Sequence, residues 1–135
     1  ELWKEVEFVK NYFELEKMRY SAGKKIHCEF PTERDCKGLM IAPLLTFTFI
    51  ENAFKYGLKS KESNFLNLKI KIENGKFIFV LENDFEENKN KNIHGGIGIE
   101  NVRKRLQLIY PKDFQLEIIS SQNIFRVQLI INLIK

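Results

Sequence analysis

Two alternating runs of apolar and polar residues, joined by Asn74 and Gly75, limit the fold of this chain more than any other feature. The runs are FLNLKIKIE (65–73) and KFIFVLEN (76–83). A period of two residues is typical of a β-strand with one buried face, and Asn-Gly readily adopts the positive φ angles of a two-residue hairpin turn. The sequence therefore predicts an antiparallel hairpin that needs cover on one face.

The elements expected around the hairpin supply that cover. Helices are expected over residues 1–20, 40–57 and 98–110, and further strands over 24–31, 114–121 and 124–134. In the first helix, apolar residues recur at spacings of four and three, which is typical of an amphipathic helix. The resulting order of elements predicts an α/β fold: a two-layer sandwich of a mixed, mostly antiparallel sheet with helices on one face.

The composition favours one globular domain and excludes several functions. The chain has 135 residues, of which 44% are hydrophobic and 30% charged, enough for a core of its own. Cys28 and Cys36 lack the spacing of a zinc site, and no apolar run is long enough to span a bilayer. The net charge of +4 suits an anionic ligand. A nucleic-acid binder rests on this charge alone, because no basic run is interleaved with aromatic residues, so we expect no nucleic-acid partner.

The segment LLTFTFIENAFKYGL (44–58) combines an almost fully apolar helix with a narrow polar stripe. At 3.6 residues per turn, the stripe consists of Thr48, Glu51, Asn52 and Lys55. A salt bridge between Glu51 and Lys55, four residues apart, is one interpretation. It leaves Asn52 unexplained, and buried polar groups are costly unless they are satisfied. A ligand site is therefore the second interpretation.

A glycine-rich segment, HGGIGIEN (94–101), precedes the last expected helix. Its glycines let the backbone approach a ligand closely, and a helix N-terminus favours phosphate. A flexible linker before an ordinary helix is the alternative interpretation. Together with an asparagine that can offer Mg²⁺ an amide oxygen, the segment favours a nucleotide site.

These segments resemble one known family. IAPLLTFTFIENAFKYGL is similar to the N-box of the LytS/YehU-type sensor histidine kinases, P-x-L-x-x-x-x-x-E-N-A-x-K-H-G. GGIGIENVRKRLQLIYP resembles their second glycine box, G-x-G-L-x-N-V-x-x-R-L-x-x-x-Y, and EVEFVKNYFELEKMRY the segment before their ATP-binding domain. The resemblance covers essentially the whole chain. It implies a Bergerat (GHKL) fold over residues 23–135, preceded in residues 1–22 by the end of the dimerisation and phospho-acceptor helical hairpin.

The resemblance implies a site for ATP and Mg²⁺ between the N-box helix and a lid over residues 84–96. It implies that Asn52 is the metal ligand and that the catalytic Glu51 polarises the attacking group or a metal-bound water. The residues implied to bind the nucleotide are Asn52, Lys55, Tyr56, Asn83, Gly96, Gly98, Ile99 and Asn101. Tyr56 stands where the family usually has His.

The sequence departs from the family at the adenine-recognising box, D-x-G-x-G. The corresponding segment is LENDFEEN, which can be read in two registers. In one, Asn83 takes the Asp position while Phe85 and Glu87 replace glycines, and in the other Glu82 takes the Asp position. The alternative function is therefore a degenerate GHKL domain that acts as a non-catalytic interaction or signalling module, with weak or no nucleotide binding.

The resemblance also implies partners outside this sequence. The acceptor histidine lies on an upstream helix, since His27 is expected in a strand and His94 in the lid. The first helix has an apolar stripe that packs either on the domain or on a missing partner helix. We expect a homodimeric full-length protein, a response regulator as partner, and a cytoplasmic location below an inner-membrane sensor. Because the chain begins at Glu1 inside an expected helix, we expect it to be a fragment.

Overall fold

The computed structural model describes residues 1–20, 24–57, 65–84, 97–121 and 123–134, with only the backbone described at residues 56, 57 and 97. The helices are α1 (Leu2–Tyr20), α2 (Phe47–Asn52) and α3 (Ile97–Ile109), and the strands are β1 (Lys25–Glu29), β2 (Phe65–Glu73), β3 (Lys76–Asp84), β4 (Phe114–Ser121) and β5 (Ile124–Asn132). A 3₁₀-helix (Arg34–Cys36) follows β1, and a π-helical turn (Ala53–Gly57) follows α2.

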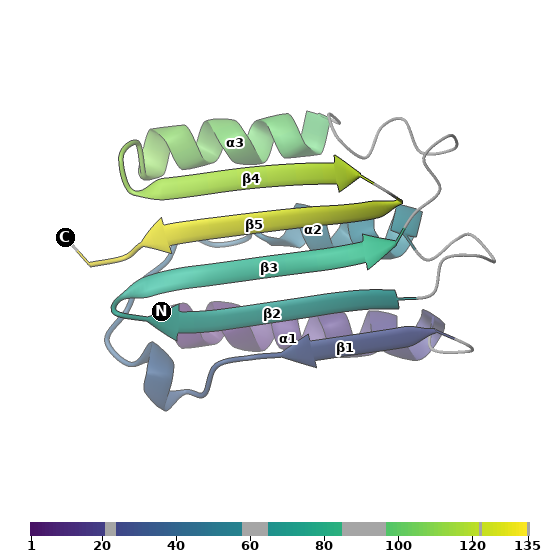
Figure 1. The fold of residues 1–135 in the computed structure, drawn as a ribbon. Coiled ribbons are helices and arrows are strands. Elements are labelled where there is room, and N and C mark those ends of the chain that lie inside the picture. Colours follow the sequence, from purple (N-terminus) through teal and green to yellow (C-terminus); the bar gives the residue numbers. More distant parts are fainter. Residues whose placement is uncertain (21–23, 58–64, 85–96, 122, 135) are drawn as a thin grey trace.

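The strands form one five-stranded sheet in the order β1-β2-β3-β5-β4 (Figure 1). Only the β1–β2 pair is parallel, and the other pairs are antiparallel. The predicted hairpin is confirmed, because Glu73 pairs with Lys76 around a turn in which Asn74 and Gly75 have φ angles of 51° and 75°. The fold class expected from the sequence is confirmed.

Alternate side chains of the central strands form the core. In β3, Phe77, Phe79 and Leu81 are at most 2% exposed, whereas their neighbours in sequence are partly exposed. Figure 1 shows α1 and α2 behind the sheet, on the side that these buried residues occupy. Burying a Phe or Leu side chain stabilises the fold by roughly 1.5–3 kcal/mol, so this layer contributes much of the stability.

Helix α1 packs on the domain itself, which was one of the two packing alternatives. Its stripe of Leu2, Val6, Val9 and Phe13 is at most 2% exposed and belongs to the core. The Phe13 ring lies 5.2 Å from that of Phe54, between centroids, in an edge-on arrangement. Such aromatic pairs add about 0.5–1.5 kcal/mol beyond the burial of their area.

The helix expected over residues 40–57 is shorter than predicted. Helix α2 begins at Phe47, and Leu44 has a φ of 61°, which is incompatible with a right-handed helix. The Leu44 amide and the Pro43 carbonyl form hydrogen bonds with Glu5 and Arg105, so other elements satisfy these backbone groups. The prediction was wrong because apolar periodicity does not register hydrogen bonds from distant parts of the chain.

Candidate functional site

The start of α3 and the polar stripe of α2 lie against each other. A Cβ atom added at Gly98 would lie 2.9 Å from Thr48 Cγ2, closer than real Cβ atoms approach. The glycine-rich box is therefore close to the N-box segment, although the two are far apart in the sequence. Gly98 permits this approach because it lacks a side chain.

Replacing Gly98 by alanine is expected to destabilise the fold by about 1–3 kcal/mol, because overpacking outweighs the usual helical advantage of alanine. Thr48→Ser removes the opposing methyl group, so Gly98→Ala should be neutral or stabilising in that background. Urea unfolding of the single and double variants measures this coupling. If Gly98→Ala changes the free energy of unfolding equally with Thr and with Ser at position 48, the close approach of Gly98 to the Thr48 methyl group is contradicted.

Helix α2 directs its polar residues to two sides. Asn52 is half-buried and lies four residues after Thr48, so both are on the side of α2 that faces α3. Glu51 is exposed, and its charge contributes to raising the pKa of Tyr12 on α1, after burial and the charge of Glu16. The amide and the carboxylate thus occupy adjacent positions at the C-terminal end of α2.

The polar stripe does not continue as a regular α-helix beyond Asn52. Residues 53–57 form a π-helical turn, a geometry that is rare and frequent at functional sites. Lys55 is exposed in this turn, while the Tyr56 side chain lies outside the described residues. A π-helical turn has more residues per turn than an α-helix, so the 3.6-residue spacing used to predict the stripe does not apply at Lys55.

Asn83, near the end of β3, brings an unpartnered acceptor to the same end of the sheet. It is 1% exposed, and its Oδ1 atom has no hydrogen-bond partner among the described residues. Its Nδ2 atom donates to the Asp84 carbonyl at 3.1 Å, which directs Oδ1 the other way. Strand β3, which carries Asn83, contacts the π-helical turn that ends the N-box segment.

In the two registers of the degenerate box, the residue at the Asp position lies on opposite faces of the sheet. Asn83 continues the buried row of Phe77, Phe79 and Leu81 on the helix-covered face. Glu82 faces the open side of the sheet and forms an ion pair with Arg126, at 3.7 Å. Asp84 accepts a hydrogen bond from the Phe65 amide at 3.0 Å, so its carboxylate helps to secure the start of β2.

The remaining predicted residues are dispersed. Ile99 is 2% exposed and packs in the core, so only its backbone is open to a ligand role. Asn101 is exposed on α3. Gly96, His94 and the expected lid beyond Asp84 lie outside the described residues. The structure thus places Gly98 against Thr48, one turn before Asn52 on α2, and places Asn83 on the strand that contacts the π-helical turn.

Two polar residues near the segment before α2, Glu5 and Thr46, were given no role from the sequence alone. Burial raises the pKa of the Glu5 carboxyl, while the Leu44 amide and the Arg105 charge act in the opposite direction. Thr46 is 2% exposed, and its hydroxyl has no hydrogen-bond partner among the described residues. Glu5 falls within the first of the motifs that resemble the family, but the sequence does not show what it contacts. In the structure its carboxylate accepts a hydrogen bond from the amide of Leu44, which has a left-handed conformation.

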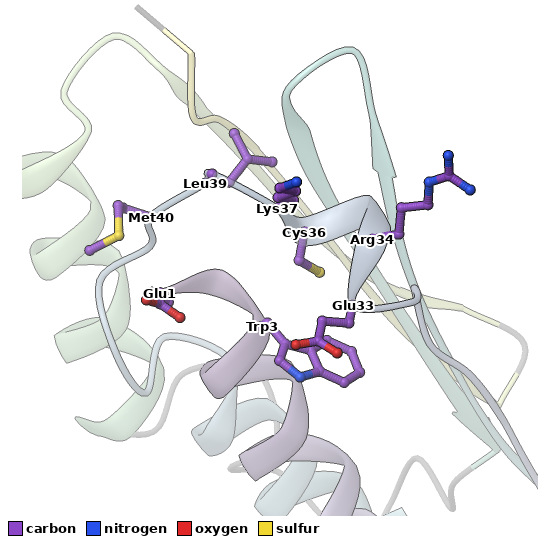
Figure 2. A pocket seen from close by; sticks show the side chains of 9 residues that line it. Glu1, Trp3, Glu33, Arg34, Cys36, Lys37, Leu39 and Met40 are labelled. Carbon is purple, nitrogen blue, oxygen red and sulfur yellow. The ribbon is translucent and has the colours of Figure 1, made fainter.

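A separate pocket of about 600 Å³ lies between the start of α1 and the 3₁₀-helix (Figure 2). Trp3, Arg34 and Leu39 are among its lining residues, and the Leu2 amide donates to the Leu39 carbonyl at 2.9 Å. Cys36 also lines it but is only 2% exposed. Burial, followed by the charge of Asp35, raises the pKa of the Cys36 thiol to about 11.

The stability of the fold is expected to fall at alkaline pH partly through Cys36. The folded pKa of about 11 lies above the ordinary value of 9.0, so this contribution is complete below pH 9.0 and is lost as the pH rises through about 11. Urea unfolding from pH 8 to 11 should show a weaker alkaline decline in Cys36→Ala than in the unchanged chain. The same slope in both would contradict the burial of this thiol.

The fold is that of the catalytic domain of histidine kinases. The histidine kinase domain of the blue-light activated histidine kinase from Erythrobacter litoralis EL346 superimposes with a TM-score of 0.69 and 16% identity, over 95% of this chain and 60% of that one. The nucleotide-free catalytic domain of histidine kinase ThkA superimposes with a TM-score of 0.59 and 12% identity, over 98% and 93%. The Acinetobacter baumannii histidine kinase AdeS superimposes with a TM-score of 0.61 and 12% identity, over 99% of this chain and 66% of that one.

The sequence is similar to the sensor protein LytS of Staphylococcus saprophyticus, with 26% identity over 130 residues. This match covers 87% of the chain and 22% of the length of LytS. No protein-family model matches the chain. The resemblance to the ATP-binding GHKL domain of LytS-type sensor histidine kinases is confirmed by the sequence match and the fold together.

Proposed function

We propose that this chain binds MgATP and transfers its γ-phosphate to a histidine that lies outside residues 1–135. The observation that carries the proposal is the convergence of three elements at one end of the sheet. The start of α3 lies against Thr48 of α2, and β3, which carries the unpartnered Oδ1 of Asn83, contacts the π-helical turn that follows α2. Buried polar atoms normally have partners, so an unsatisfied acceptor at such a site favours a ligand.

Asn83 is proposed to recognise the base. Its Nδ2 atom is engaged by the Asp84 carbonyl, so the free Oδ1 can accept a hydrogen bond from the exocyclic amino group of adenine. Guanine has an oxygen at the equivalent position, which would oppose Oδ1. The bond to adenine lacks the charge assistance that an aspartate would supply.

The polar end of α2 is proposed to hold the metal and the phosphates. Asn52 offers an amide oxygen, a ligand that suits Mg²⁺ together with the phosphate oxygens. Lys55 contacts phosphate in this proposal, as do the backbones of Gly96, Gly98 and Ile99. Two further side chains have supporting roles. Tyr56 lines the nucleotide, and Asn101 positions the first turn of α3.

Glu51 is proposed to act on the attacking group. Bound MgATP supplies the phosphoryl group and much of the charge neutralisation, while the protein mainly positions and orients the reactants. Glu51 is exposed beside α1, so its carboxylate is accessible to an incoming imidazole. It would accept or orient the imidazole proton while Asn52 holds the metal on the adjacent position of the helix.

The histidine acceptor is proposed to lie on an upstream helix. His27 is exposed on β1, where it belongs to the sheet and not to a helix. Residues 1–22 would end the dimerisation hairpin, and residues 23–135 would form the catalytic domain. The exposed Leu15 and Met18 of α1, 64% and 77% accessible, suit contact with another helix. None of the described helices is both long and apolar enough to cross a membrane.

The full-length protein is proposed to be a homodimeric sensor. Its catalytic domain would lie in the cytoplasm below an inner-membrane sensor part, and a response regulator would take the phosphate from the histidine. No nucleic-acid partner is proposed. These proposals rest on the similarity to LytS, of which the chain spans 22% of the length.

Calorimetric titration of the 135-residue chain tests nucleotide binding, with MgATP and MgADP as ligands and MgGTP as the matched control. Binding of both adenine nucleotides with weaker binding of MgGTP is the expected result. No heat and no thermal shift at millimolar MgATP would overturn the proposal. Equal affinity for MgGTP would overturn the role of Asn83 but not that of α2.

A degenerate, non-catalytic signalling domain with weak or no nucleotide binding is the second candidate, because Asn83 stands in place of the family's aspartate. On this hypothesis Asn83→Asp with Phe85→Gly should create or strengthen MgATP binding. Asn67→Asp on the exposed face of β2 is the control for the added charge. Micromolar binding of MgATP by the unchanged chain would exclude this candidate.

A further inference from the structure

The segment before α2 adopts a strained conformation. Leu44 has a φ of 61°, in the left-handed region that residues other than glycine seldom occupy. Its side chain is 47% exposed, so core packing does not account for this conformation. Local strain of this kind persists only where the surrounding structure imposes it.

A carboxylate on α1 holds this residue. Glu5 Oε2 accepts a hydrogen bond from the Leu44 amide at 2.9 Å, across 39 positions of the sequence. Bonds between a charged acceptor and an amide are among the stronger hydrogen bonds in proteins. Glu5 is only half-buried, and Arg105 is near enough for its charge to favour the ionised carboxylate.

Helix α3 and Tyr110, the residue directly after it, hold the two preceding residues. Arg105 Nη2 donates to the Pro43 carbonyl at 3.0 Å, and the Ala42 amide donates to the Tyr110 hydroxyl oxygen at 2.9 Å. Residues 42–44 are therefore attached to both α1 and α3. Helix α2 begins at Phe47, so the conformation at Leu44 helps to determine where α2 lies.

We propose that Glu5 is a positioning residue for the candidate nucleotide site, which it affects by holding Leu44 in the left-handed conformation at the approach to α2. The position of α1 is thereby coupled to the positions of Glu51 and Asn52. Displacement of α1 would break the Glu5–Leu44 bond, relax the segment and shift α2. This inference rests on the proposed function for its effect on nucleotide affinity, but not for its effect on the backbone.

Amide hydrogen exchange of the 135-residue chain tests the backbone effect without nucleotide. Glu5→Ala should accelerate exchange at Leu44 by about tenfold or more, since it removes the charge-assisted hydrogen bond that protects this amide. Glu5→Gln keeps an acceptor and should retain most of the protection. Glu7→Ala, an exposed position on the same helix, is the matched control and should change nothing.

A second substitution separates positioning from general destabilisation. Glycine adopts positive φ angles freely, so Leu44→Gly should reduce the effect of Glu5→Ala on MgADP affinity. We expect Glu5→Ala to weaken the binding of MgADP by about tenfold, corresponding to loss of one hydrogen bond. Adding Leu44→Gly to the Glu5→Ala variant should recover most of the lost affinity.

Unchanged exchange at Leu44 in Glu5→Ala would overturn the inference. Faster exchange with unchanged MgADP affinity would overturn the coupling to the site. Absence of MgADP binding in the unchanged chain would instead refute the proposed function, while the exchange measurements would still decide whether Glu5 holds the segment.

Discussion

Asn52→Ala is expected to weaken Mg²⁺-dependent nucleotide binding by at least about 100-fold while leaving the fold intact. Altering groups that merely support a metal ligand costs roughly 10–100-fold, and Asn52 is proposed as the ligand itself. The side chain is half-buried and neutral, so its removal leaves no buried charge without a partner. Calorimetric titration with MgADP measures the affinity, and a urea unfolding curve shows whether the fold is intact.

Asn67→Ala provides the control for Asn52→Ala. Asn67 is exposed on β2 and lies on the open face of the sheet, away from α2. This variant should bind MgADP like the unchanged chain. A second comparison uses ADP with EDTA, for which Asn52→Ala and the unchanged chain should differ little. Equal MgADP affinity in the Asn52 variant would show that the metal lies elsewhere.

Phe13→Ala is expected to reduce the free energy of unfolding by about 3–5 kcal/mol, the range for large-to-small changes in a core. The side chain is fully buried, and its ring contacts those of Phe30 and Phe54 at centroid distances of 6.3 and 5.2 Å. Since small domains are stable by only about 5–15 kcal/mol, the variant should be strongly destabilised. Urea unfolding monitored by circular dichroism measures the loss.

Leu15→Ala is the matched control on the same helix. Leu15 is 64% exposed, so its truncation should change the free energy of unfolding by less than about 0.5 kcal/mol. Similar small effects at both positions would show that α1 is not part of the core in solution. A large effect at Leu15 would indicate that another surface covers it.

The sequence predicted the elements whose signals are local. Alternation over residues 65–73, the apolar run within 76–83 and the conformational preference of Asn74 and Gly75 define the hairpin, and the structure reproduces that pairing. The spacing of apolar residues in α1 likewise identified the stripe that is buried. Both patterns depend on neighbours a few residues apart, so they can be read without knowledge of the fold.

The register of the degenerate box could not be read from the sequence. Strand β3 has apolar residues on both faces, with Phe79 on one and Val80 on the other, so alternation alone did not say which face is covered. The packing of α1 and α2 on one side decided that Asn83 is buried and Glu82 is not. The unpartnered acceptor of Asn83 is therefore a property of the tertiary structure.

By itself, the sequence determined that a hairpin, an amphipathic first helix, a polar stripe and a glycine-rich helix start would exist, because each depends on short-range spacing. Only the tertiary structure decided that α2 begins at Phe47 and not at residue 40. The reason is physical: Glu5 and Arg105, far away in the chain, form hydrogen bonds with the backbone at Leu44 and Pro43. Packing between distant segments likewise places Gly98 so close to Thr48 that a larger side chain would be crowded, which no local pattern reveals.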